Sequence, residues 1–108
     1  MIQEFYSVND DNDEGRPDGG YVQGVGLNIN WQKGPLGRGD ERVDANGAFV
    51  ETVIAAVIQR IEYYQGDGKF ACQENAIAIA DLQHALLVLG ERTARREAQG
   101  TEGTHEGN

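Results

Sequence analysis

An arginine-containing stretch near the end of the sequence is the first group of residues that could bind a ligand. Arg92, Arg95 and Arg96 lie within five residues of one another, and Thr93 lies between them. Arg92 and Arg96 share a face if the segment is helical. Guanidinium groups form paired hydrogen bonds with phosphate oxygens, and a threonine hydroxyl adds a further donor. The pattern therefore indicates an anion site, with simple electrostatic stabilisation of a helix C-terminus as an equally weighted alternative.

A second candidate group surrounds the glycine-containing turn at residues 66–68. Three aromatic residues, one lysine and several amides fall within residues 63–75. Aromatic rings stack on nucleobases, and amides hydrogen-bond to base edges. This composition fits a nucleotide site, whereas packing at the end of a helical hairpin is the alternative that composition alone favours. The residues concerned are Tyr63, Tyr64, Gln65, Lys69, Phe70 and Asn75.

Other chemistries are disfavoured by the spacing of the relevant residues. The acidic run at residues 10–15 resembles a calcium loop, but Tyr21 occupies the position where an EF-hand needs a carboxylate. Cys72, His84 and His105 have no partners at catalytic or metal-ligand spacing. The sequence has no phosphate-binding loop motif. It therefore predicts a binding protein and not an enzyme, with no cofactor and no metal.

Length and charge set broader limits. The chain has 108 residues, 39% of them hydrophobic, and a single cysteine, which predicts one small domain without a disulfide framework. There are 18 acidic and 9 basic residues, giving a net charge of −9. Such a surface disfavours binding to DNA, to RNA and to anionic membranes. The sequence has no apolar run of membrane-spanning length and no signal peptide at its start, so cytosol is the expected compartment.

The N-terminal part is predicted to contribute short strands. Residues 1–19 are expected to form an acidic arm or loop, because the stretch 9–20 has no large apolar side chain. Residues 1–8 are either a short strand or part of that arm. Residues 21–32 alternate between apolar and polar types, which predicts one half-buried strand. Its partners must come from the first residues, from residues 36–45 or from another subunit.

The C-terminal part is predicted to form a helical hairpin over residues 46–98. Apolar residues recur at steps of three and four over residues 48–65 and again over residues 72–96. The second helix is apolar on nearly all sides, which predicts self-association through it. The expected class is α+β: antiparallel strands in a region over residues 20–45, then a long antiparallel two-helix hairpin, assembling as an oligomer. Residues 99–108 form a glycine-rich tail.

Three stretches of this sequence have a familiar combination of residues. They read GYVQGVGLNINWQKGP, ANGAFVETVIAAVIQRIEYYQ and GKFACQENAIAIADLQHALLVLGERTARREAQGTEGTHE, and they fall within residues 20–106. Together they resemble the phage Thoeris anti-defence proteins of the first type. The hairpin is also similar to the related anti-CBASS sponges, but the strand before it favours the Thoeris type. The resemblance implies a non-catalytic sponge that sequesters nucleotide immune signals in the cytoplasm of the infected bacterium.

The resemblance also implies ligands and an assembly. The expected ligand is glycocyclic ADP-ribose, which TIR-domain enzymes make from NAD, and cyclic trinucleotides or dinucleotides are further candidates. Dimers of hairpins that build a hexamer are the expected assembly. The residues that correspond to the glycocyclic ADP-ribose pocket are Tyr64, Gln65, Asn75, Gly34 and Pro35. Those that correspond to the cyclic-trinucleotide pocket are Arg92, Thr93 and Arg96. The stacking position itself stays open between Tyr63, Tyr64 and a replacement by Gln65.

Two competing interpretations remain. In the first, the chain is an oligomeric protein-interaction module without a nucleotide ligand, and its apolar second helix docks another protein. In the second, the chain is an enzyme that degrades the nucleotide, which only observed turnover would support. The arginine cluster favours the sponge over the interaction module, because the latter leaves these cations with only a helix-end role.

Overall fold

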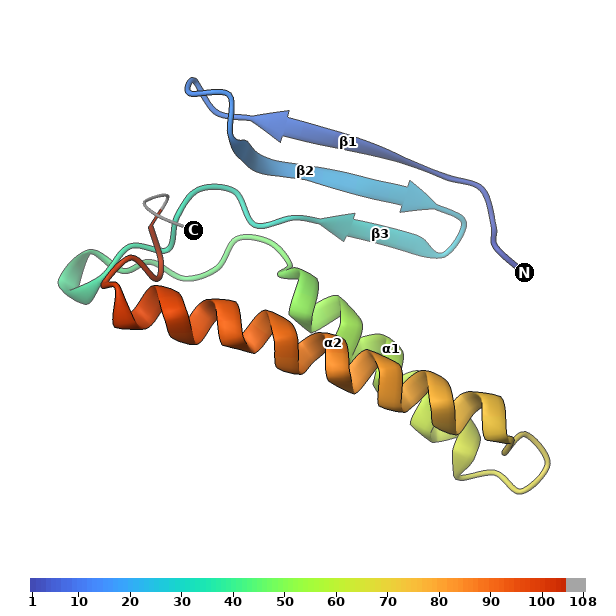
Figure 1. Cartoon of the computed structure of the whole chain (residues 1–108). Helices are drawn as coiled ribbons and strands as arrows, with labels where there is room; N and C mark the ends of the chain where they lie inside the picture. Colours follow the sequence, from blue (N-terminus) through green and yellow to red (C-terminus); the bar gives the residue numbers. More distant parts are fainter. Residues whose placement is uncertain (105–108) are drawn as a thin grey trace. The chain divides into compact units, whose positions relative to one another are not determined.

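The computed structural model describes residues 1–104, which divide into two compact units. The first unit comprises residues 1–49 with 103–104 and contains three strands and a short 3-10 helix, η1 (Gly39–Glu41). The second comprises residues 50–102 and contains two α-helices (Figure 1). The α+β class predicted from the sequence is confirmed. The finer division of the chain into an arm, a strand region, a hairpin and a tail within one domain stays a prediction.

The strands β1 (Phe5–Asp11), β2 (Pro17–Gly24) and β3 (Leu27–Asn30) form one antiparallel sheet in the order β1-β2-β3. The prediction of a single strand over residues 21–32 is wrong. Gly24 pairs with Leu27, so the chain reverses at the two residues between them. Gly26 has a φ of 71°, a value that glycine adopts without a steric penalty. The alternating pattern therefore belongs to two strands of a hairpin.

The predicted acidic loop over residues 9–20 is also corrected, because β1 and β2 occupy most of it. Asn9 pairs with Gly20, and only the short connection between the strands is a turn. The Asn12 carboxamide oxygen accepts hydrogen bonds from the backbone N–H groups of Glu14 (2.9 Å) and Arg16 (3.1 Å). Backbone pairing and this side-chain-supported turn order the segment without burying apolar side chains. Of the three sources of strand partners left open, the first residues of this chain are the ones used.

The loop that follows the sheet is held by side chains that bond to its backbone. Asn46 accepts a hydrogen bond from the Lys33 backbone N–H and donates one to the Lys33 carbonyl, both at 2.8 Å. The Asp18 carboxylate accepts one from the Gly34 N–H at 2.6 Å. Trp31 and Ala48 form an isolated parallel bridge. The chain is therefore anchored on both sides of the loop that contains Gly34.

The second unit is a helical hairpin of α1 (Val50–Gln65) and α2 (Gln73–Ala98), which pack against each other. These bounds confirm the two predicted helices to within about two residues at each end. One row of apolar residues at helical spacing on α2, which we call its seam, is partly buried, whereas several other apolar residues of this helix are exposed. Ile58 of α1, 6% exposed, is the only buried hydrophobic residue within residues 1–104. The seam residues are Ile79, Leu82, Leu86 and Leu89.

A second set of apolar side chains on the hairpin is exposed. We call it the outer stripe, and its members are 44–61% exposed. One helix covers only one side of α2, so apolar side chains on its other sides stay exposed. Neither helix is long and apolar enough to cross a membrane within the described residues. The outer stripe consists of Val50, Val57, Ile77, Leu87 and Val88.

Candidate functional site

The tip of the hairpin carries a cluster of exposed aromatic rings, which we call the tip cluster: Tyr63, Tyr64 and Phe70. The Tyr64 ring centroid lies 6.4 Å from that of Tyr63 and 6.4 Å from that of Phe70. Tyr63 and Phe70 are 65% and 58% exposed, and Tyr64 is 37% exposed. Aromatic rings contribute most to stability when they are buried. The exposure of all three rings therefore favours contact with a ligand or partner over packing within this chain.

Two amide side chains hold the turn that places these rings. The Gln65 carboxamide oxygen accepts a hydrogen bond from the backbone N–H of Cys72, the N-cap residue of α2, at 2.9 Å. The Asn75 amide nitrogen donates one to the Phe70 carbonyl at 3.2 Å. Each carboxamide therefore keeps one of its two ends for another partner: the nitrogen of Gln65 and the oxygen of Asn75. The predicted residues Tyr64, Gln65 and Asn75 lie together at this tip.

Two cations lie over the rings of the tip cluster. The Arg60 guanidinium carbon is 4.9 Å from the Tyr64 ring centroid and 5.3 Å from that of Tyr63. The Arg60 Nε also donates a hydrogen bond to the Tyr64 hydroxyl at 3.1 Å. The Lys69 ammonium lies 5.9 Å from the Phe70 ring centroid. Sequence reasoning assigned no role to Arg60. The available signal was its spacing: Tyr63 and Tyr64 follow it by three and four residues, which places all three side chains on one face of a helix.

The other two residues predicted for this pocket, Gly34 and Pro35, lie in the first unit, on the loop tied by Asn46 and Asp18. Gly34 has a φ of 80°, which suits glycine. The side chain of Gln32 donates weak hydrogen bonds to the carbonyls of Lys33 and Gly34, each at 3.2 Å. The backbone of this loop is therefore fixed locally, as a pocket wall requires. Its role in closing the pocket remains a prediction.

The arginine-containing group lies at the opposite end of α2 from the tip cluster. Arg92 lies 17 positions after Asn75 in α2, which corresponds to about 26 Å along the helix axis. α2 has 26 residues and α1 has 16, so α2 is ten residues longer. The arginines therefore lie on the part of α2 that extends past the start of α1. Two candidate pockets on this chain would be well separated.

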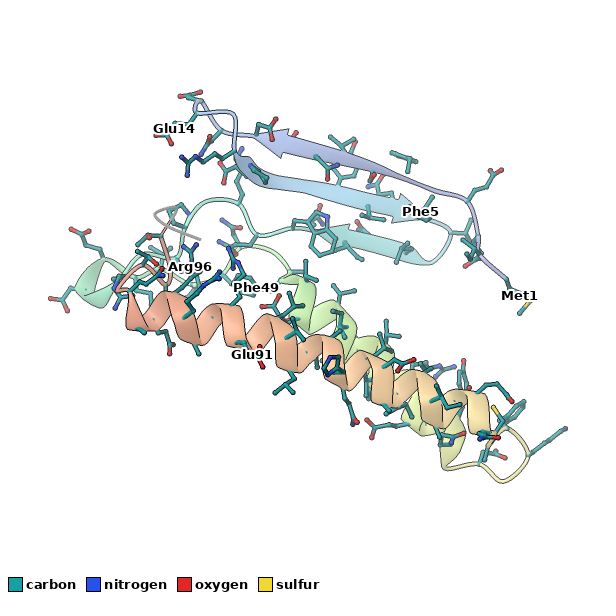
Figure 2. All side chains as sticks on the ribbon, viewed as in Figure 1. Met1, Phe5, Glu14, Phe49, Glu91 and Arg96 are labelled. Carbon is teal, nitrogen blue, oxygen red and sulfur yellow. The ribbon has the colours of Figure 1, made fainter. Side chains whose placement is uncertain are left out.

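The three residues of this group have different surroundings. Arg92 is exposed. The Thr93 hydroxyl donates a hydrogen bond to the Leu89 carbonyl at 3.5 Å. Arg96 is only 7% exposed, and its Nη2 donates to the Thr101 carbonyl at 3.0 Å; Figure 2 shows its side chain on the last turns of α2. Arg96 therefore stabilises the chain that follows the helix, a role that sequence reasoning did not predict.

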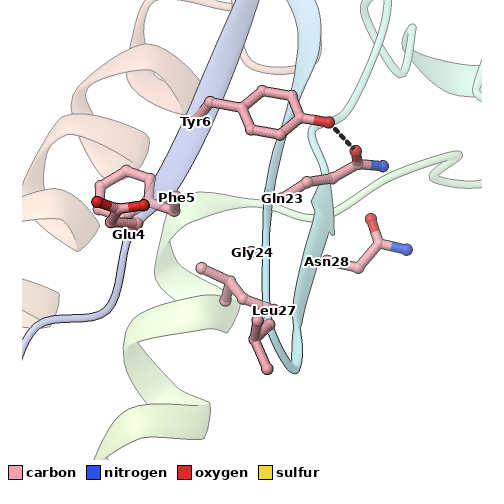
Figure 3. Close-up of a pocket in the computed structure, with 8 residues that line it drawn as sticks. Glu4, Phe5, Tyr6, Gln23, Gly24, Leu27 and Asn28 are labelled. Carbon is pink, nitrogen blue, oxygen red and sulfur yellow. Dashed lines mark hydrogen bonds between the residues drawn. The ribbon is translucent and has the colours of Figure 1, made fainter.

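The sheet has a separate hollow of about 820 Å³, open to solvent, at the ends of its strands. Tyr6, Gln23 and Asn28 form a row across the three strands. The Tyr6 hydroxyl donates to the Gln23 carboxamide oxygen at 2.7 Å (Figure 3). Gly24 leaves a gap between the side chains of Phe5 and Leu27. Sequence reasoning assigned no ligand to this hollow.

The chain thus combines an antiparallel sheet with a helical hairpin whose tip is cationic and aromatic. Residues 23–94 match the Acb2/Tad1 hairpin domain, and the chain belongs to this family. The resemblance seen in the sequence is thereby confirmed. The matched segment contains the whole tip cluster together with Arg92 and Thr93, whereas Arg96 falls just beyond it.

One curated relative adds detail. The chain is 47% identical over 78 residues to Thoeris anti-defense 1 of Bacillus phage SBSphiJ7. The aligned segment covers 72% of this chain and 51% of that protein. The chain therefore spans about half the length of this relative.

Proposed function

We propose that this chain is a phage anti-defence protein that binds and sequesters cyclic nucleotide immune signals without cleaving them. The observation that carries the proposal is the tip cluster, where exposed aromatic rings, two cations and two half-satisfied amides meet on a domain of this family. The name of the relative, an anti-defence protein against Thoeris, supports the same function. By trapping the signal, the protein prevents activation of the downstream effector in the cytoplasm of the infected bacterium.

Glycocyclic ADP-ribose is the ligand proposed for the tip. Its adenine would stack on Tyr64, with Tyr63 as the alternative ring. The free carboxamide ends of Gln65 and Asn75 would bond to its polar groups. The Gly34-Pro35 loop would close the pocket in the assembled protein. A chain of net charge −9 repels anions at long range, so capture depends on local cations at the site.

A cyclic trinucleotide is the ligand proposed for the arginine group, and cyclic dinucleotides are a further candidate. The exposed Arg92 supplies the accessible guanidinium, and Thr93 supplies a hydroxyl. Arg96 is already engaged with the Thr101 carbonyl, so it would contribute to this pocket chiefly by holding the end of α2 in place. Copies of the same group around a symmetric assembly would multiply the positive charge at one site.

The proposed assembly is a dimer of hairpins that builds a hexamer. Ile58 is the only buried apolar residue within residues 1–104, which is a thin core for a chain of this length. The outer stripe supplies exposed apolar area that a second copy would cover. Light scattering tests this proposal, since a purely monomeric protein would exclude it.

An oligomeric interaction module without a nucleotide ligand is the second candidate. The outer stripe favours it, because the same exposed residues would serve a different protein partner equally well. This candidate gives the tip cluster no role, so the effect of tip substitutions on nucleotide binding separates the two.

Equimolar mixing of protein and glycocyclic ADP-ribose tests the proposed function. The filtrate after ultrafiltration is measured by liquid chromatography, with bovine serum albumin in place of the protein as the blank. A tight sponge removes most of the ligand from the filtrate at equimolar concentration. Ligand that passes through quantitatively would exclude sequestration, and a degraded ligand in the filtrate would instead indicate an enzyme.

A further inference from the structure

We propose that Arg60 is a phosphate-binding residue of the hairpin tip, held in position by Tyr63 and Tyr64. The identity of the nucleotide that it meets rests on the function proposed above. The role itself rests on the geometry of the Arg60 side chain. Within residues 1–104, the Arg60 Nε donates a hydrogen bond to the Tyr64 hydroxyl, and its two terminal amino groups make no hydrogen bond.

The guanidinium is fixed by three contacts. Two tyrosine rings lie within cation–π distance of it, and the Tyr64 hydroxyl accepts its Nε–H. The backbone spacing of Arg60 from Tyr63 and Tyr64 brings all three groups to one face of α1. A side chain held in this way loses less conformational freedom when it binds an anion, which strengthens binding.

The charge of Arg60 is not neutralised within the described residues. Arg60 forms no ion pair there, although the chain has twice as many acidic as basic residues. Lys69 of the same tip also forms no ion pair. A strongly acidic chain thus presents two unneutralised cations beside three exposed rings. This arrangement suits a ligand that has both an anionic group and a planar ring. A nucleotide has both, because its phosphate is anionic and its base is planar.

Helix electrostatics alone does not account for this arrangement. The favourable interaction of a cation with the helix dipole is confined to the last turn, and Arg60 lies before the last turn of α1. That interaction requires neither a stacked pair of exposed rings nor a hydrogen bond through Nε. The two terminal amino groups match the spacing of two phosphate oxygens, which a lysine cannot reproduce.

The test compares four variants with the wild-type protein by calorimetric titration with glycocyclic ADP-ribose. Arg60→Gln removes the charge. Arg60→Lys keeps the charge but lacks the two terminal amino groups that can bind two phosphate oxygens together. Asn75→Ala tests whether the ligand binds at the hairpin tip at all. Arg16→Gln, in the turn between β1 and β2, removes one positive charge elsewhere and is the matched control. Circular dichroism and light scattering confirm that each variant keeps its fold and assembly.

The proposal predicts that Arg60→Gln weakens binding about tenfold or more, the scale of a lost hydrogen bond to a charged group. Arg60→Lys recovers only part of this loss, and Arg16→Gln binds like the wild type. Binding to Arg60→Gln also depends less on salt concentration, because one charge pair has been removed. Wild-type affinity in Arg60→Gln, alongside weak binding in Asn75→Ala, would overturn the proposal while leaving the sponge function intact.

A second probe keeps the proposal testable if the wild-type protein does not bind glycocyclic ADP-ribose. Adenosine diphosphate at millimolar concentration is added, and the Nε–H resonance of Arg60 is followed by NMR. The proposal predicts a saturating shift of this resonance, which adenosine without phosphates does not produce. An Arg60 resonance that adenosine diphosphate does not shift would overturn the proposal independently of the fate of the sponge function.

Discussion

At the scale of single residues, Arg92 and Arg96 carry the same charge in different surroundings. Arg96 is buried and bonds to the Thr101 carbonyl, whereas Arg92 is exposed. Arg96→Ala should therefore lower the free energy of unfolding by about 1–3 kcal/mol. Arg92→Ala should change it by no more than about 0.5 kcal/mol. Urea denaturation at one fixed protein concentration measures both, and equal losses would contradict the structural role of Arg96.

Asn75 and Arg92 should affect different ligands. Asn75→Ala removes a group at the tip, so it should weaken glycocyclic ADP-ribose and spare cyclic trinucleotides. Arg92→Ala should do the converse, because the two groups are about 26 Å apart along α2. Gln73→Ala, an exposed neighbour on the first turn of α2, is the control. Calorimetry with each ligand checks this pair, and parallel losses for both ligands would show that one pocket serves both.

Gly20 should be the least replaceable residue of the sheet. Its φ is 120°, and a Cβ at this position would overlap the Val8 carbonyl oxygen of the paired strand. Gly20→Ala should lower the free energy of unfolding by about 2 kcal/mol or more. Gly26→Ala meets nothing within 4 Å, so it should cost about 1 kcal/mol of left-handed strain alone. A thermal shift that is equal for both variants would contradict this ranking.

Sequence reasoning found the residues of the tip but not how they interact. Composition alone favoured hairpin packing for this turn, and the family resemblance assigned Tyr64, Gln65 and Asn75 to a nucleotide pocket. The structure brings these residues together at one turn. Arg60 was missed because a charged residue on an exposed helix face is usually solvated. The position of its guanidinium over two rings distinguishes it, and its spacing from Tyr63 and Tyr64 was the sign of this in the sequence.

At the scale of elements, the helices were predictable and the strands were only partly so. A period of three and four persists through both helices, and the turn at residues 66–68 separates them clearly. The strands were harder to predict because a two-residue turn lies within residues 21–32. The alternation of apolar and polar residues continues across this turn, so the sequence does not reveal it. For residues 1–8 the choice between a short strand and an arm stayed open, because the residues of β1 are exposed except Val8 and burial leaves almost no pattern in its sequence.

The outer stripe of the hairpin should control assembly. Leu87 is 61% exposed and lies on the face of α2 opposite its seam. Leu87→Glu would place a charge in an apolar interface, so it should dissociate the oligomer. Gln83→Glu adds the same charge to an exposed polar position of α2 and should leave assembly unchanged. Light scattering over a range of protein concentrations distinguishes the two, and an intact Leu87→Glu oligomer would exclude this face as the interface.

At the scale of the whole molecule, a thin core and an acidic surface constrain the function together. With one buried apolar residue within residues 1–104, stability and assembly are expected to be linked. With a net charge of −9, an anionic ligand gains nothing from long-range attraction. Tight capture must then come from slow release out of a well-formed site, which is what a sponge requires.

The most direct test of the account is to recover the captured ligand. The protein is mixed with glycocyclic ADP-ribose, unbound ligand is removed by filtration, and the protein is denatured by heat. The released material is identified and quantified by mass spectrometry. The account predicts intact glycocyclic ADP-ribose at near-stoichiometric amounts relative to protein chains. Release of a degraded product, or of no nucleotide at all, would contradict it.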